Sequence, residues 1–147
     1  MSQRTFQFQL SSRPASDPGD SSIVVERLND EGQWQTQHPS LHMPPFRLHL
    51  IAMLLCLRYH LEAEARERGI PLQKVKAAFT ATVSDSWDLQ ELDARFSLWL
   101  DPEASPEARQ RADDTAIAAM GERMRLSPVS RNRPVGVPLQ LELALQA

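Results

Sequence analysis

The chain has 147 residues, of which 41% are hydrophobic and 24% are charged, and this composition is typical of one soluble globular domain. Its 16 Lys and Arg residues are outnumbered by 19 Asp and Glu residues, which leaves a formal net charge of -3 at pH 7. Proteins that bind nucleic acid need a basic surface to displace the counterions of the phosphates. We therefore expect no nucleic-acid partner.

The chain contains one cysteine, Cys56, so no disulfide can form within it, and a metal site with several cysteine ligands is excluded. A free thiol is typical of a reducing compartment. The first ten residues lack the features of a secretory signal, and the longest uninterrupted apolar run, 50–57, is far shorter than a membrane-spanning helix. We therefore expect a cytoplasmic protein with no membrane partner.

Alternation of apolar and polar side chains predicts three short strands near the beginning of the chain, over residues 5–10, 23–28 and 33–37. In the first of them Phe6, Phe8 and Leu10 would share one face. The segment 11–22 between the first two strands is rich in Pro, Gly, Ser and Asp, which predicts a loop.

A long helix is predicted next, from residue 46 to about residue 68, with Pro44 and Pro45 at its start and Gly69 at its end. Residues 46–61 are apolar on almost every side of this helix, whereas its last turns are charged. A helix that is apolar all round must be enclosed all round. We therefore expect a sheet on one side of it and a second copy of the chain on the other.

The remainder of the chain predicts a hairpin, a helix and a final strand. Residues 74–84 and 92–100 alternate strictly and would pair in antiparallel fashion. Ser105 and Pro106 predict the start of a helix that runs to about Met124. Its buried stripe would consist of Ala112, Ala116, Met120 and Met124, and residues 137–145 have the pattern of a closing strand.

The predicted fold class is therefore α+β, in the order βββ-α-ββ-α-β, with a mostly antiparallel sheet packed on a central buried helix. The whole chain, residues 1–147, forms one domain in this interpretation. Its parts are N-terminal strands within 1–40, the central helix within 44–69, and the ββ-α-β unit within 72–147.

The thiol of Cys56 is the first candidate for chemistry, because it lies near the middle of the predicted central helix. His49 and His60 share roughly one helix face with it, whereas Arg58 points elsewhere. A nearby cation could activate a thiolate at this position. The alternative is that Cys56 acts as a small buried hydrophobic residue, as free cysteines usually do.

Two other chemistries are not favoured by the sequence. His38 and His42, together with Cys56 and His60, give two pairs at a spacing of four, but one thiolate is a poor zinc signature, and we expect no metal. Ser127 lies in a polar, basic segment but lacks the sequence context of a serine nucleophile, so we interpret this segment as a loop.

Several segments, in order, resemble the OsmC/Ohr family of bacterial thiol-dependent hydroperoxide reductases. Residues 48–61 (LHLIAMLLCLRYHL) look like the central helix of the family, with Cys56 at its peroxidatic cysteine. Residues 69–72 (GIPL) are similar to its connection into the next strand. Residues 126–130 (LSPVS) look like its Cys-Pro-x-Ser segment, and residues 136–145 resemble its closing strand.

This resemblance covers the chain from about residue 39 onward and implies an intertwined homodimer, in which sheets of both subunits enclose the two central helices. It also implies a reaction. In the family the first cysteine attacks the hydroperoxide, becomes a sulfenic acid and is resolved by the second cysteine as a disulfide. An arginine of the N-terminal loop and a glutamate before the central helix hold the thiolate.

The chain departs from this pattern at two positions. Ser127 stands where the family has its second cysteine, and Phe46 stands near the place of the glutamate, with no acidic residue between Gly32 and Glu62. Arg13 is the arginine available in the first predicted loop. Because a serine cannot resolve a sulfenic acid, turnover would require an external thiol or a disulfide to the same cysteine of the other subunit.

Two functional hypotheses follow. The first is a stress-response hydroperoxide reductase with Cys56 as nucleophile, Arg13 as stabilising cation, and His60, His49 and Ser127 as polar neighbours. It would use no cofactor, and an apolar pocket would favour organic hydroperoxides over hydrogen peroxide. The second is a non-catalytic dimer that binds a small apolar ligand or acts as a scaffold, which the missing cysteine and acid favour.

Overall fold

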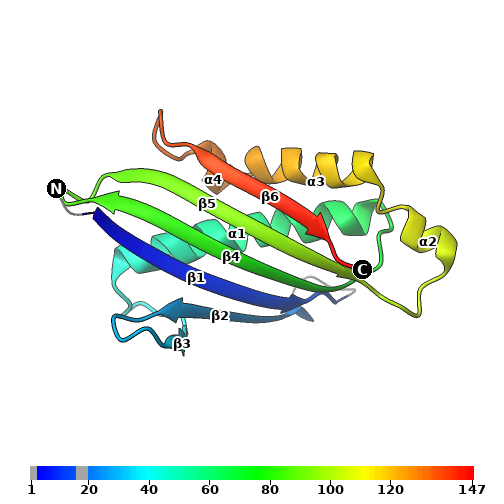
Figure 1. Cartoon of the computed structure of the whole chain (residues 1–147), viewed down its shortest axis with the longest axis horizontal. Coiled ribbons are helices and arrows are strands. Elements are labelled where there is room, and N and C mark those ends of the chain that lie inside the picture. Colours follow the sequence, from blue (N-terminus) through cyan, green and yellow to red (C-terminus); the bar gives the residue numbers. More distant parts are fainter. Residues whose placement is uncertain (1–2, 16–19) are drawn as a thin grey trace.

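The computed structural model describes residues 3–15 and 20–147, and within them six strands form one sheet with α-helices packed on one of its faces (Figure 1). The strands are β1 (Gln3–Arg13), β2 (Ser22–Leu28), β3 (Trp34–Thr36), β4 (Leu72–Ser84), β5 (Leu89–Leu100) and β6 (Leu139–Leu145). The helices are α1 (Pro45–Glu67), α2 (Pro106–Gln110), α3 (Asp114–Arg125) and α4 (Pro128–Arg131). The predicted α+β class is confirmed.

The strands lie in the order β3-β2-β1-β4-β5-β6. All neighbouring pairs are antiparallel except the last, because β6 returns from the helical side of the sheet and pairs with β5 in parallel. The predicted hairpin is the pair β4 and β5. Its inward positions are buried as expected at Val75, Ala77, Phe79, Ala81, Val83, Leu92, Ala94, Phe96 and Leu98, whereas Leu100 is half-buried.

Strand β1 is longer than the sequence predicts. Residues 11–13 belong to it and pair with β2, with Ser12 opposite Ile23, so the predicted loop begins later; residues 16–19 of that loop lie outside the described part. The run of serines was interpreted as a loop, but Ser12 occupies the next inward position after Leu10. Its hydroxyl is buried there because it has a hydrogen-bond partner on α1, described below.

The central helix is confirmed. Helix α1 begins at Pro45, where the missing N–H of proline costs no helical hydrogen bond, and Gly69 terminates it in the left-handed conformation, with φ of 70°. The helix runs across the inner face of the sheet (Figure 1). Its side toward the strands is fully buried at Leu50, Ile51, Leu54, Leu57 and Leu61.

The prediction of one helix from Ser105 to Met124 was wrong, because the chain forms two. Ser105 caps α2 as expected, but Asp113 supplies a second cap, whose carboxylate accepts a hydrogen bond from the backbone N–H of Ala116 at 2.8 Å. A strong internal cap lets the chain turn and begin α3 in a new direction. The predicted stripe is buried on α3 at Ala116, Met120 and Met124, and α3 packs against α1.

A short helix that the sequence did not predict, α4, follows α3 and also packs against α1. Pro128 is its first residue, and Ser127 occupies the position before it. The segment had been interpreted as a basic loop because its charged residues dominate the pattern. Ser127 and Ser130 are nevertheless buried, whereas the charged side chain of Arg131 is exposed to solvent.

A buried ion pair on α1 is hydrogen-bonded to the first strand of the sheet. Nη1 of Arg58 lies 3.0 Å from Oε1 of Glu62, and both side chains are less than 9% exposed. The hydroxyl of Ser12 on β1 donates to Oε2 of Glu62 at 2.9 Å. This cluster, which we call the Arg58–Glu62–Ser12 cluster, ties one side of α1 to β1 and thereby fixes the rotation of α1 about its axis.

We expect Glu62→Gln to destabilise the protein by about 3–5 kcal/mol, because it leaves the buried charge of Arg58 without its counterion. Urea unfolding followed by circular dichroism measures this loss. The triple variant Ser12→Ala, Arg58→Met, Glu62→Leu removes all the buried polar groups together, and it should unfold at the same urea concentration as the wild type or a higher one.

Glu67→Gln is the matched control, because Glu67 pairs with Arg123 while 61% of its side chain is exposed. Surface pairs contribute only about 0–1 kcal/mol, so this variant should remain close to the wild type. Equal stabilities of Glu62→Gln and Glu67→Gln would show that the cluster does not hold α1 to the sheet.

Candidate functional site

Cys56 lies near the middle of α1, on the side that faces away from the sheet. Its neighbours Leu54 and Leu57 point into the core and are 0% and 1% exposed, whereas Cys56 itself is half-buried. The helix geometry therefore places the thiol at the boundary between the core and solvent, within reach of a small molecule.

The same side of α1 carries an apolar stripe, consisting of Leu48, Ala52, Leu55, Cys56 and Tyr59 at helical spacing. Ala52 and Tyr59 are exposed, and the other three are half-buried. The sequence predicted that this helix is enclosed on every side. Within one chain, the sheet covers one side and α3 and α4 cover part of the rest, so the apolar stripe stays open.

His60 lies one helical turn after Cys56 and is half-buried. Burial lowers the pKa of this histidine below its ordinary value of 6.5, and the positive charge of Arg123 lowers it further. Arg123 is itself fixed on α3 by Glu67 and Glu64, at 2.7 and 3.3 Å. The imidazole is therefore neutral at neutral pH and can accept a proton.

His49 lies two turns before Cys56 and is exposed, with its ring 6.3 Å from that of Phe46. The structure thus brings Cys56, His60 and His49 onto neighbouring positions of one helix, as the sequence predicted from their spacing. The first turn of α1 carries no acidic residue, so a carboxylate at the helix start is missing in the fold as it is in the sequence.

Arg13 lies elsewhere. It is exposed at the end of β1, whereas the preceding residue, Ser12, points toward α1. Successive side chains of a strand point to opposite faces, so Arg13 belongs to the open face of the sheet. One chain alone does not bring Arg13 and Cys56 together.

Ser127 is 2% exposed, and its hydroxyl donates to the carbonyl oxygen of Met124 at 2.7 Å. The hydroxyl therefore stabilises the turn between α3 and α4. This local role explains why a serine is accommodated at this buried position.

Sequence reasoning missed the Arg58–Glu62–Ser12 cluster. It treated Arg58 only as a residue on another helix face, and Glu62 as the start of a solvated helix end. The spacing of four between Arg58 and Glu62 was an available signal, because oppositely charged residues at this spacing meet on a helix. No local signal identifies Ser12, which is 50 residues from Glu62.

In 3–15 and 20–147, no group of three or more His, Cys, Asp or Glu side chains is arranged to hold a metal ion. His38 and His42 are both exposed. Among the same residues, no helix has the length and the apolar character needed to cross a membrane.

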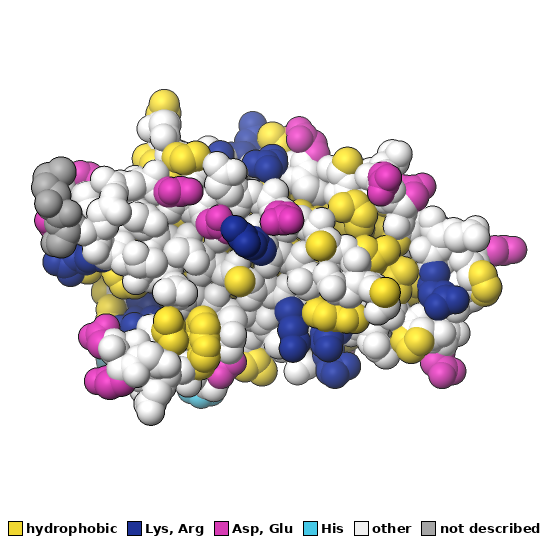
Figure 2. Space-filling view, viewed as in Figure 1, with side chains coloured by type: hydrophobic (Ala, Val, Ile, Leu, Met, Phe, Trp, Pro, Cys, Tyr) yellow, Lys and Arg dark blue, Asp and Glu magenta, His cyan; other side chains and the backbone are white. Residues whose placement is uncertain are grey.

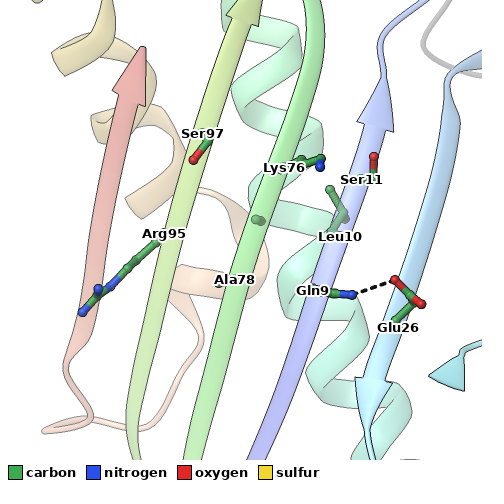
Figure 3. A pocket seen from close by; sticks show the side chains of 9 residues that line it. Gln9, Leu10, Ser11, Glu26, Lys76, Ala78, Arg95 and Ser97 are labelled. Carbon is green, nitrogen blue, oxygen red and sulfur yellow. Dashed lines mark hydrogen bonds between the residues drawn. The ribbon is translucent and has the colours of Figure 1, made fainter. Parts of the chain in front are cut away.

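The open face of the sheet offers a second candidate, a depression of about 390 Å³. Its side chains come from β1, β2, β4 and β5, and include Gln9, Glu26, Lys76 and Arg95 (Figure 3). Basic and acidic side chains are interspersed over this face (Figure 2). Antiparallel sheets commonly expose one polar face to water, so we interpret the depression as part of a solvated surface.

The lowered pKa of His60 gives a testable pH dependence. The unfolded chain binds this proton more readily, so the contribution of His60 to stability is fully present above pH 6.5 and is lost as the pH falls below 6.5 toward the lowered value. The wild type should therefore lose more stability than His60→Gln between pH 7.5 and pH 5.5, an interval chosen to span roughly one unit on either side of 6.5.

Urea unfolding across this interval measures the difference. Tyr59→Phe is the control, because it keeps the ring that lies 5.2 Å from His60 and should retain the wild-type profile. If the stabilities of the wild type and His60→Gln changed equally with pH, the lowered pKa of His60 would be contradicted. The carboxyl of Glu64, whose pKa the hydrogen bond from Arg68 holds below 4.5, contributes only at lower pH.

No protein-family model matches the chain, and no curated protein matches it in sequence. Several solved structures are similar to it in fold, including the following three. A Psychrobacter arcticus protein described as an osmotic stress induced and detoxification response protein has a TM-score of 0.55 and 12% identity, covering 82% of this chain and 86% of its own.

An OsmC-like protein of Mycoplasma pneumoniae has a TM-score of 0.54 and 14% identity, covering 84% of this chain and 89% of its own. An OsmC-like hydroperoxide resistance protein of a Jannaschia species has a TM-score of 0.52 and 11% identity, covering 87% and 85%. At these identities the likeness concerns the backbone arrangement. The chain therefore has the OsmC-like fold that its sequence resembles, in a form too divergent for a family model to match.

Proposed function

We propose that the protein is a one-cysteine organic hydroperoxide reductase of the stress response, which acts in the cytoplasm as a homodimer with an external thiol as reductant. One observation carries the proposal. Cys56 is half-buried on the outward side of the central helix, in a fold that the chain shares with an OsmC-like hydroperoxide resistance protein.

In the first step the thiolate of Cys56 attacks the outer oxygen of the hydroperoxide. An S–O bond forms as the O–O bond breaks, so the sulfur is oxidised to a sulfenic acid and the hydroperoxide is reduced to an alcohol. His60, one turn away and neutral, accepts the proton of the thiol and returns it to the departing alkoxide.

In the second step an external thiol condenses with the sulfenic acid, which releases water and leaves a mixed disulfide on Cys56. A second thiol attacks this disulfide, leaves as the oxidised reductant and restores the free cysteine. An external thiol is needed because Ser127 cannot form a disulfide. A reducing cytoplasm supplies such thiols.

The apolar stripe around Cys56 favours an organic substrate. A second copy of the chain packed against this stripe would enclose the thiol in apolar surroundings. An alkyl or aryl group that leaves water for such surroundings gains about 25 cal/mol per Å² of buried apolar surface, a gain that hydrogen peroxide lacks.

The second candidate function is the binding of a small apolar ligand by a non-catalytic dimer. The presence of a serine at position 127, in place of the family's second cysteine, supports it. The hydroxyl of this serine is committed to the carbonyl of Met124, so the position serves the turn after α3. The first turn of α1 also lacks the acidic residue that the resemblance leads one to expect. In this alternative Cys56 contributes only to the lining of an apolar site.

The deciding experiment measures the reaction of Cys56 with cumene hydroperoxide. We expect one sulfenic acid per chain, trapped by dimedone and located by mass spectrometry, and a rate at least about 100-fold above that of free cysteine, as expected for a thiol served by a positioned base. Added dithiothreitol should then sustain consumption of the hydroperoxide beyond one equivalent.

Variants separate the two functions. Cys56→Ser should abolish the reaction, His60→Gln should slow it at least about tenfold, and Tyr59→Phe should leave it unchanged. Arg13→Gln tests the role that the resemblance gives to Arg13, with a slower reaction expected if Arg13 serves the thiolate. A wild-type rate equal to that of free cysteine, with apolar-probe binding retained in Cys56→Ser, would contradict the enzyme and favour the binding protein.

A further inference from the structure

A cavity of about 530 Å³ is lined by residues from the beginning of β1, the end of β2, the first turn of α1 and the turn between β4 and β5. These segments lie at one end of the molecule (Figure 1). The cavity is separate from the region of Cys56. Arg47, which lines the cavity, precedes Cys56 by nine residues, or about 14 Å along the helix axis. A volume of this size suits a small molecule, since ligand sites typically span roughly 300–1,000 Å³.

Three arginines line this cavity: Arg4 on β1, Arg27 on β2 and Arg47 on α1. Within the described residues, none of the three forms an ion pair. The Nε atoms of Arg27 and Arg47 are buried and have no hydrogen-bond partner in that part of the chain. The one side-chain hydrogen bond among them is a long one, from Arg27 to the carbonyl oxygen of Leu28 at 3.4 Å.

Arg27 and Arg47 also repel one another. Burial lowers the pKa of Arg47, and the positive charge of Arg27 lowers it further. Guanidinium groups are normally paired when they are withdrawn from water, because an uncompensated charge is costly there. Arg27 and Arg47 are half-buried and form no ion pair within the described residues, so their unused Nε donors and open guanidinium ends could be completed by an anion.

An aromatic wall stands beside the arginines. The ring of Trp87 lies 6.2 Å from that of Phe6, and 5.5 Å edge-on from that of Phe46. The guanidinium carbon of Arg4 lies 4.2 Å from the centre of the Trp87 ring, which fixes this arginine over the indole.

Trp87 has a φ of 68°, a left-handed conformation that is strained for a tryptophan. Hydrogen bonds between Ser84 and Asp88 hold the turn in this form. Strain of this kind persists where the surroundings impose it, and it often marks a functional site.

The charge of the cavity selects the ligand. Asp30 is the one acidic residue that lines it, so three guanidinium groups and one carboxylate leave a net charge of +2. We propose that this cavity binds the phosphate dianion of a small phosphorylated molecule. Arg27 and Arg47 are the main hydrogen-bond donors to the phosphate, and the side of the cavity formed by Phe6 and Trp87 contacts an apolar part of the same molecule. Guanidinium groups match phosphate oxygens in geometry as well as in charge.

Calorimetric titration with inorganic phosphate, phenyl phosphate and benzoate tests the proposal. We expect phenyl phosphate to bind more tightly than inorganic phosphate, and benzoate, which has the same ring but one charge, to bind at least tenfold more weakly than phenyl phosphate. In nuclear magnetic resonance spectra of the wild type, phenyl phosphate should shift the Nε–H signals of Arg27 and Arg47, and leave that of Arg95 in place.

Arg47→Gln should weaken the binding of phenyl phosphate at least tenfold. Because Arg47 has no partner to lose in the described residues, this variant should melt at or above the wild-type temperature. Arg95→Gln is the matched control, an exposed arginine on the open face of the sheet, and should bind as the wild type does.

Three results would overturn the proposal: no heat and no shifted signals with phenyl phosphate, equal affinities of the wild type and Arg47→Gln, or equal affinities for phenyl phosphate and benzoate. A smaller mass of Arg47→Gln in solution would overturn it as well, since it would assign the arginines to a contact between subunits. None of these measurements involves Cys56, so failure here is distinguishable from failure of the proposed reductase.

Discussion

Residues 46–61 of helix α1 are apolar on nearly every side, and a single chain can cover only part of this segment. The sheet takes one side, with Leu50, Leu54 and Leu57 fully buried, and α3 and α4 take part of another. The side that remains open carries Leu55 and the thiol of Cys56, both half-buried. The hydrophobic effect disfavours leaving such a surface in water, and this one constraint is the physical reason for proposing a partner copy that encloses the thiol.

The buried ion pair decides which side of α1 stays open. Arg58 and Glu62 lie on the opposite side of the helix from Cys56, and the hydrogen bond that Ser12 on β1 donates to Glu62 fixes the helix rotation. An all-apolar helix could rotate on an apolar sheet with little loss, because dispersion and burial are not directional. A buried polar contact accepts one geometry only, so the cluster on one side of α1 fixes the position of Cys56 on the other side.

Local pattern was sufficient for α1 and the hairpin of β4 and β5, because long periodic segments carry their own signal. It failed where a single side chain overrode the pattern, as at Asp113, whose cap divides one predicted helix into two. In the site, helical spacing alone places His60 one turn after Cys56 on α1. Interactions between distant segments, such as the hydrogen bond from Ser12 to Glu62 and the effect of the charge of Arg27 on the pKa of Arg47, depend on the assembled fold and leave no mark in the local sequence.

The most direct test of this account is sedimentation equilibrium of the purified chain, combined with the rate at which a bulky thiol reagent labels Cys56 at the same concentrations. The account predicts a mass twice that of the 16.6 kDa chain, and labelling far slower than that of an unfolded control. A mass of one chain throughout the micromolar range, with Cys56 labelled as fast as in the unfolded control, would contradict it.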